Sequence, residues 1–224
     1  LCFAVASGGI FGTALFALAG MIEEHIYPAY AGLRIPLRVL APTIFIVAIL
    51  GVFRGFFQGK STMVPTAVSQ VLEQIVNAVV SVSAAYLFMK WNADSLVRSA
   101  WGAAGGTLGT CLGALTALTL VVFVYCIYRP IQKKMERRDR SRRVYTTAHI
   151  YRILFLTILP IILSQTVYQI SGLIDYYLFS DVMGARGVSD KVISSLTGIY
   201  SSNYRTLTSV PIAISTSIAS SMIP

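Results

Sequence analysis

The chain has 224 residues, of which 55% are hydrophobic and 12% are charged, and its formal net charge is +9. Soluble globular domains carry about 25% charged residues, so this composition argues against one, and it excludes a disordered chain, a collagen and a disulfide scaffold. Apolar stretches of about 20 residues, the length that crosses a bilayer, recur along the chain, so the sequence predicts an all-α polytopic transmembrane bundle.

Six membrane spans are predicted in chain order. Their approximate ranges are 1–22, 36–58, 65–89, 100–128, 152–179 and 206–223. Each is long enough for a hydrocarbon layer about 30 Å thick. The chain opens at Leu1 and closes at Pro224 in or next to apolar runs, so we expect an internal fragment of a longer protein.

Basic residues concentrate between the fourth and fifth spans. The stretch 129–152 holds nine Lys and Arg residues against two acidic ones. Cytoplasmic loops are enriched in Lys and Arg, so we expect this stretch to be cytoplasmic. It can act simply as a topogenic loop or bind anionic lipids, whereas no fold or aromatic pattern accompanies the charge to indicate nucleic acid. The predicted parts are four spans in 1–128, a basic linker in 129–151 and two spans in 152–224.

Glycines recur at helical spacing in three of the spans. Such spacing lets helix backbones approach closely, so it predicts helix packing rather than a ligand site. The repeats are Gly8 and Gly12, then Gly51, Gly55 and Gly59, then Gly105, Gly109 and Gly113.

Polar side chains form a stripe on the third span. At 100° per residue they fall within an arc of about 140°, and the opposite face is apolar. The members are Thr66, Ser69, Gln70, Glu73, Gln74, Asn77 and Ser81. A stripe of this kind faces protein or a water-filled cavity, so either interhelical hydrogen bonds or a cavity wall can explain it.

The fifth span carries a second stripe. Its members are Ser164, Gln165, Tyr168, Gln169, Gly172 and Asp175. Asp175 and Gln165 are candidates for ion coupling or for the outer part of a cavity, and interhelical hydrogen bonding is again the alternative. Two polar stripes on different helices favour a shared aqueous cavity.

No catalytic signature is present. His25 and His149 have no partner at ligand spacing, and the Walker, H-E-x-x-H and G-x-S-x-G motifs do not occur. The sequence therefore predicts no enzyme, cofactor or metal site, and it favours transport or a structural role in the membrane.

The sharpest motif begins at Arg54, with R-G-F-F-Q-G at 54–59 and P-T-A-V-S-Q-V-L-E-Q at 65–74. It resembles the corresponding segment of MurJ-like and stage V sporulation protein B-like flippases, which belong to the multidrug/oligosaccharidyl-lipid/polysaccharide superfamily. The resemblance covers nearly all of the chain and is most specific at 34–77. It implies a two-lobed fold of about fourteen helices, of which the six spans are the third to eighth.

The same resemblance implies a function in the bacterial plasma membrane. Members of the family move a polyprenyl-pyrophosphate-linked oligosaccharide from the inner to the outer leaflet by alternating access, and lipid II is the cargo we favour. The expected partners are this substrate, membrane lipids and cell-wall synthesis proteins. The residues that we expect to contribute to the cavity or its gate are Arg54, Gln70, Glu73, Gln74 and Asn77.

Alternatives remain at this point. Arg54 lies at the end of a span and can simply extend its charge to the interface, or it can contact phosphate, which suits a guanidinium. A cation-coupled multidrug exporter of the MATE type would use Glu73 and Asp175 as ion-coupling acids. A membrane scaffold without transport activity is the third possibility.

Overall fold

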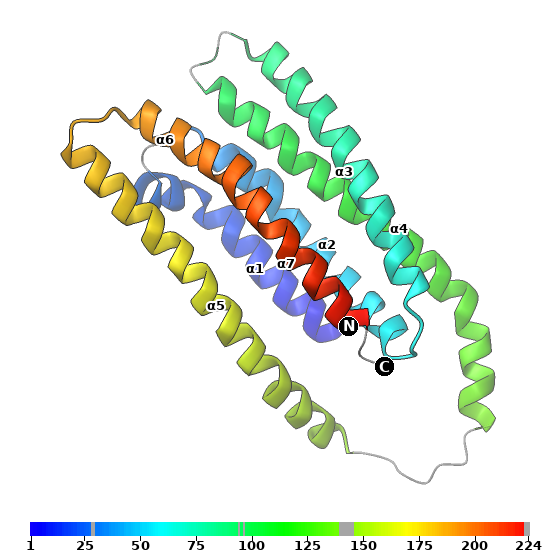
Figure 1. Ribbon diagram of the computed structural model, residues 1–224. Helices are drawn as coiled ribbons and strands as arrows, with labels where there is room; N and C mark the ends of the chain where they lie inside the picture. Colours follow the sequence, from blue (N-terminus) through cyan, green and yellow to red (C-terminus); the bar gives the residue numbers. More distant parts are fainter. Residues whose placement is uncertain (28–29, 94, 96, 139–145, 222–224) are drawn as a thin grey trace. The chain divides into compact units, whose positions relative to one another are not determined.

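The computed structural model describes residues 1–27, 30–93, 95, 97–138 and 146–221, and all regular elements among them are helices (Figure 1). In order, they are α1 (Cys2–Met21), the π-helix η1 (Ile22–Ile26), α2 (Arg34–Gln58), α3 (Val64–Trp91), α4 (Arg98–Arg138), α5 (Thr147–Ala185), α6 (Asp190–Ile199), the π-helix η2 (Tyr200–Tyr204) and α7 (Arg205–Ser221). The predicted all-α class is confirmed.

Five helices are long and apolar enough to cross a membrane. They are Cys2–Ile26, Arg34–Gln58, Val64–Trp91, Arg98–Met135 and Thr147–Ala185. The sixth predicted span, 206–223, corresponds to α7, which has 17 residues and is not one of these five; residues 222–223 lie outside the described part. Helix α4 continues through Arg138, well beyond the predicted span, and α5 begins at Thr147. The remaining linker residues, 139–145, lie outside the described part.

The chain divides into two compact units, Leu1–Arg137 and Arg138–Pro224. The first unit holds α1, η1, α2, α3 and nearly all of α4, and the second holds α5, α6, η2 and α7. Large apolar side chains such as Phe11, Val79 and Leu163 are more than half exposed. Such outward apolar surface is expected of helices that contact lipid tails.

Glycines produce two close helix contacts in the first unit. A Cβ atom added at Gly8 would lie 2.8 Å from the Cβ of Ala48, and one added at Gly12 would lie 3.1 Å from the carbonyl oxygen of Ala41, so α1 packs tightly on α2. The third repeat does the same for α3 and α4. A Cβ atom added at any of its members would meet the backbone of α3 within van der Waals distance; these are Gly105, Gly109 and Gly113. Both packing predictions are confirmed.

For the glycine repeat on the second span, the described residues provide no packing partner. Added Cβ atoms at Gly51 and Gly55 would meet nothing within 4 Å, and at Gly59 the nearest atoms belong to the preceding turn of its own chain. These glycines lie at exposed positions near the end of α2. Spacing alone permits close approach, but a neighbouring helix must occupy that face.

The core of the first unit joins α2 to α4. It consists of Leu50 and Phe57 from α2 and Ala117 and Val121 from α4, all at most 3% exposed. Aromatic rings extend the core toward the end of α2: Phe56 contacts Tyr125 edge to face, with 5.3 Å between ring centroids. This core fixes α2 beside α4 at the end of α2 that carries Arg54.

Candidate functional site

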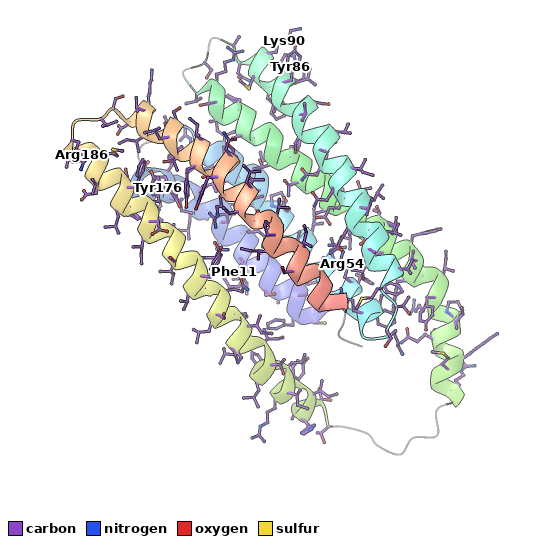
Figure 2. All side chains as sticks on the ribbon, viewed as in Figure 1. Phe11, Arg54, Tyr86, Lys90, Tyr176 and Arg186 are labelled. Carbon is purple, nitrogen blue, oxygen red and sulfur yellow. The ribbon has the colours of Figure 1, made fainter. Side chains whose placement is uncertain are left out.

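Two of the predicted site residues, Arg54 and Glu73, form an ion pair. Nη2 of Arg54 donates a hydrogen bond to Oε2 of Glu73 over 2.6 Å. The two side chains are 16% and 17% exposed, so the pair is mostly buried but still accessible. Figure 2 places Arg54 near the end of α2 that leads into α3. The pair therefore connects the last turns of α2 to the first half of α3.

Ser69 determines how the guanidinium of Arg54 is oriented. Nε of Arg54 donates to the Ser69 hydroxyl oxygen over 3.0 Å, and that hydroxyl donates to the carbonyl of Thr66 over 2.7 Å. Ser69 is completely buried. Because the Nε–H of Arg54 is already bonded to Ser69, Glu73 accepts a hydrogen bond from Nη2 alone and does not form a bidentate pair with the guanidinium.

The turn between α2 and α3 explains why these residues meet. The backbone N–H groups of Lys60 and Thr62 both donate to the carbonyl of Phe57 over 3.0 Å, and Ser61 has a positive φ of 56°. Pro65 lies in the first turn of α3, where a backbone N–H has no helical partner to reach. A tight turn of this kind returns the chain beside α2, so Arg54 lies opposite Ser69 and Glu73.

Farther along α3, the polar stripe packs against α4. The Ser81 hydroxyl lies within hydrogen-bond distance of both Asn77 Oδ1, at 2.8 Å, and the Gly106 carbonyl, at 2.9 Å. The Thr110 hydroxyl lies 3.5 Å from the same Asn77 oxygen. The predicted site residue Asn77 therefore belongs to a neutral hydrogen-bonded contact between two helices, next to the glycines that bring those helices together.

The predicted site residues Gln70 and Gln74 lie apart from this contact. Both are exposed at the surface of the first unit, whereas Thr66 and Ser69, on the same stripe, are buried. The stripe thus has an inner edge that bonds to α2 and α4 and an outer edge that carries two amide side chains. The structure brings Arg54 and Glu73 together directly, whereas the two glutamines are exposed.

Sequence reasoning missed three contributors to this site. Ser69 and Ser81 were recognised as members of the stripe but not as site residues, and Thr110 on α4 was not recognised at all. The available signal for Thr110 is its place beside Gly109, in the repeat that packs on α3.

Two buried hydroxyls in the first unit, those of Thr43 and Thr66, have no hydrogen-bond partner.

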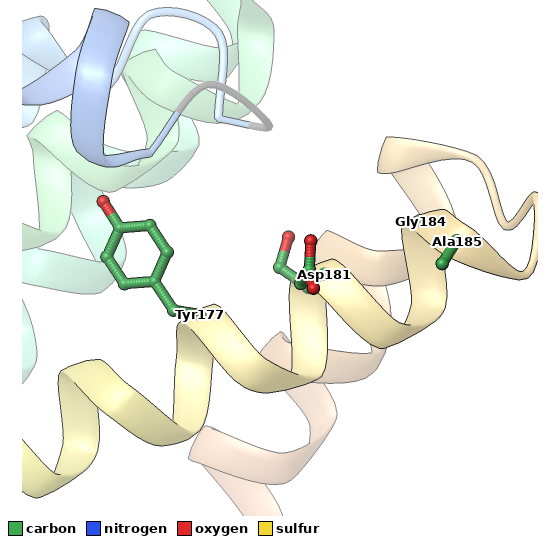
Figure 3. Close-up of a pocket in the computed structure, with 5 residues that line it drawn as sticks. Tyr177, Asp181, Gly184 and Ala185 are labelled. Carbon is green, nitrogen blue, oxygen red and sulfur yellow. The ribbon is translucent and has the colours of Figure 1, made fainter.

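In the second unit, the predicted residues Asp175 and Gln165 are both exposed on α5. A shallow hollow lies nearby on the same helix (Figure 3). Its lining residues are Tyr177, Ser180, Asp181, Gly184 and Ala185. Neither Asp175 nor Gln165 is among them, and one helix supplies the entire lining, so the hollow by itself defines no site. Within the described residues, no group of three or more His, Cys, Asp or Glu side chains could hold a metal ion.

Comparison with known proteins identifies the class. The family described as "Polysaccharide biosynthesis protein" matches residues 2–224, and the chain belongs to this family. With its apolar helices, it is a multi-pass membrane protein. No solved structure matches the chain.

Three curated relatives come from Bacillus subtilis (strain 168). The chain is 27% identical over 189 residues to stage V sporulation protein B, which covers 84% of the chain and 35% of the relative. It is 28% identical over 196 residues to lipid II flippase MurJ, covering 84% of the chain and 34% of the relative. It is 27% identical over 207 residues to the uncharacterized membrane protein YabM, covering 92% of the chain and 37% of the relative. The chain thus spans about a third of the length of the relatives that it matches.

Proposed function

We propose that this chain is part of a flippase that carries a lipid-linked oligosaccharide across the membrane. Family membership and the similarity to lipid II flippase MurJ support the transport class. The single observation that carries the proposal is the accessible Arg54–Glu73 pair, because a charged pair kept within apolar helices is costly and marks a functional place in a membrane protein. The activity is transport rather than catalysis.

The proposed cargo is lipid II, the peptidoglycan precursor. Its diphosphate is anionic and its sugars carry many hydroxyls, so both need polar surroundings within the hydrocarbon layer. In this proposal Arg54 contacts the diphosphate, and Gln70 and Gln74, which are exposed on the same helix as Glu73, bind sugar hydroxyls. Glu73 orients Arg54, and Asn77 fixes α3 against α4 behind them.

The proposed architecture follows the family. Residues 1–128 complete a first lobe, residues 152–224 begin a second, and the basic stretch 129–151 joins them on the cytoplasmic side of a bacterial plasma membrane. In that orientation Arg54 and Glu73 lie toward the cytoplasmic end of their helices, where the cargo enters. Asp175 and Gln165 then lie on the second lobe, with Asp175 toward the outer end of α5, and alternating access moves the cargo between the two leaflets.

The test is a lipid II accessibility assay in cells depleted of the full-length parent protein. We expect depletion to remove lipid II from the outer leaflet, and expression of the unaltered parent to restore it. The variant Arg54→Gln should fail to restore it at equal expression. Arg38→Gln is the matched control, because Arg38 belongs to the same helix but lies over the Phe16 ring, 5.3 Å from its centroid.

Two results would contradict the proposal. If the outer-leaflet pool of lipid II persists after depletion, lipid II is not the cargo. If depletion instead abolishes dye export, the MATE-type exporter is the correct function. The pairing of Glu73 with Arg54 favours the flippase over that exporter, because an acid that couples a cation must be available to bind it.

A further inference from the structure

We propose that Glu73 is an internal competitor of the cargo: in the empty protein it occupies Arg54 in place of a phosphate, and an incoming diphosphate displaces it. The inference rests on the proposed function, since it assigns a second role to a residue of the same site. It makes Glu73 a determinant of affinity and specificity rather than a contact of the cargo.

The first argument is the isolation of the two charges. The predicted spans of the first unit are 1–22, 36–58, 65–89 and 100–128, and apart from Arg38, which lies near the start of α2 over the Phe16 ring, their only charged residues are Arg54 and Glu73. Together they are neutral. An unpaired guanidinium among apolar helices is costly, so an empty transporter needs a counter-charge for Arg54, and Glu73 supplies it.

The second argument is that the ion pair uses only some of the hydrogen-bond donors of Arg54. A guanidinium has five N–H donors, and in the described part of the chain only Ser69 and Glu73 accept from Arg54, one bond each. The remaining donors are on Nη1 and Nη2. Phosphate oxygens bind such a planar edge in a bidentate manner and carry more negative charge than one carboxylate. A diphosphate can therefore form more hydrogen bonds with Arg54, and attract its charge more strongly, than the Glu73 carboxylate does.

The third argument is that Arg54 keeps its orientation when Glu73 leaves. Its Nε bond to Ser69 does not involve Glu73, and Ser69 is itself bonded to the Thr66 carbonyl. In the described residues, the bonds from Arg54 are the only side-chain hydrogen bonds between α2 and α3, whereas α3 has separate bonds to α4 through Ser81. Displacement of Glu73 therefore breaks a link between α2 and α3 without disturbing the contact between α3 and α4.

The experiment measures binding of farnesyl diphosphate, a short polyprenyl diphosphate, to the full-length parent in lipid nanodiscs. Glu73→Gln should bind the diphosphate about three- to tenfold more tightly than the unaltered protein, because an accessible ion pair is weak but must be broken for binding. Arg54→Gln should bind more weakly. The double variant should match Arg54→Gln, since Glu73 has nothing to compete for once Arg54 is gone. Farnesol, which has the same tail without charge, should bind all four proteins equally.

The outcomes separate this inference from the proposed function. If the unaltered protein binds farnesyl diphosphate no better than farnesol, the diphosphate cargo is wrong and the inference falls with it. If Arg54→Gln weakens binding but Glu73→Gln also weakens it, or leaves it unchanged, the cargo stands and the competition is refuted. If Glu73→Gln does not fold, Glu73→Asp serves in its place, because the shorter acid weakens the pair; tighter binding supports the inference and unchanged or weaker binding overturns it.

Discussion

One polar stripe on α3 has two regions with different chemistry. Around Arg54 and Glu73 the contact is charged, links α3 to α2 and remains 16–17% exposed. Around Asn77 and Ser81 the contact is neutral, links α3 to α4 and is reinforced by glycines at which an added Cβ atom would clash with the α3 backbone. The first region can exchange one partner for another at low cost, whereas the second can change only by separating two helices. One helix thus carries both a contact that can change its partner and a contact that holds two helices rigidly together.

The largest effect is expected in the neutral region. Gly109→Ala places a methyl group against the backbone of Ser81, which cannot move aside like a side chain, so overpacking should destabilise the protein by about 1–3 kcal/mol. Gly106→Ala is the matched control: its added Cβ meets nothing within 4 Å, and alanine favours the helix by about 0.5–1 kcal/mol. Thermal unfolding of the purified full-length parent measures both. Equal melting temperatures would show that α3 and α4 are not closely packed there.

A smaller effect is expected in the charged region. Glu73→Ala leaves Arg54 mostly buried without a counter-charge and should lower the free energy of unfolding by about 1–2 kcal/mol. The loss is smaller than for a fully buried pair, because water still reaches Arg54. Replacing both residues by glutamine should restore part of that loss. The same unfolding measurement applies, at low and high salt. If the double variant is less stable than Glu73→Ala, the pair is a structural element and not an exchangeable contact.

The smallest effect on stability is expected at the exposed edge. Gln70→Ala and Gln74→Ala should change the unfolding free energy by less than about 0.5 kcal/mol, because neither side chain is buried. Both should nonetheless reduce the restoration of outer-leaflet lipid II, since in our proposal they bind the sugars. Full transport by the double alanine variant would remove the two glutamines from the site and restrict it to Arg54 and its partners.

Much of the fold could be predicted because hydrophobic length and glycine spacing are local properties of the sequence. Five of the six predicted spans form helices that are long and apolar enough to cross a membrane. The site was predicted less completely. The third-span stripe indicated Glu73 and Asn77 as neighbours on one face, but the angle around a helix cannot tell which neighbour contacts α2, which contacts α4 and which remains exposed.

The second-span glycines illustrate the same limit. Their spacing matches that of Gly105, Gly109 and Gly113, yet among the described residues no helix packs on Gly51 or Gly55. Likewise, Arg54 could have extended into solvent at the end of its span or turned inward, and nothing within 54–59 distinguishes these alternatives. The deciding partner, Ser69, lies across a turn and on another helix.

The amino-acid sequence by itself determined that the chain is helical, that it crosses a membrane several times and that its basic residues gather in one stretch, because these properties depend on composition and on the local order of residues. Only the tertiary structure decided that Arg54 is paired with Glu73, that Asn77 is part of helix packing and that Gln70 and Gln74 remain exposed. The physical reason is that a side chain's partner depends on which helices lie beside it, and helix neighbours are fixed by turns and close packing distributed over the whole unit.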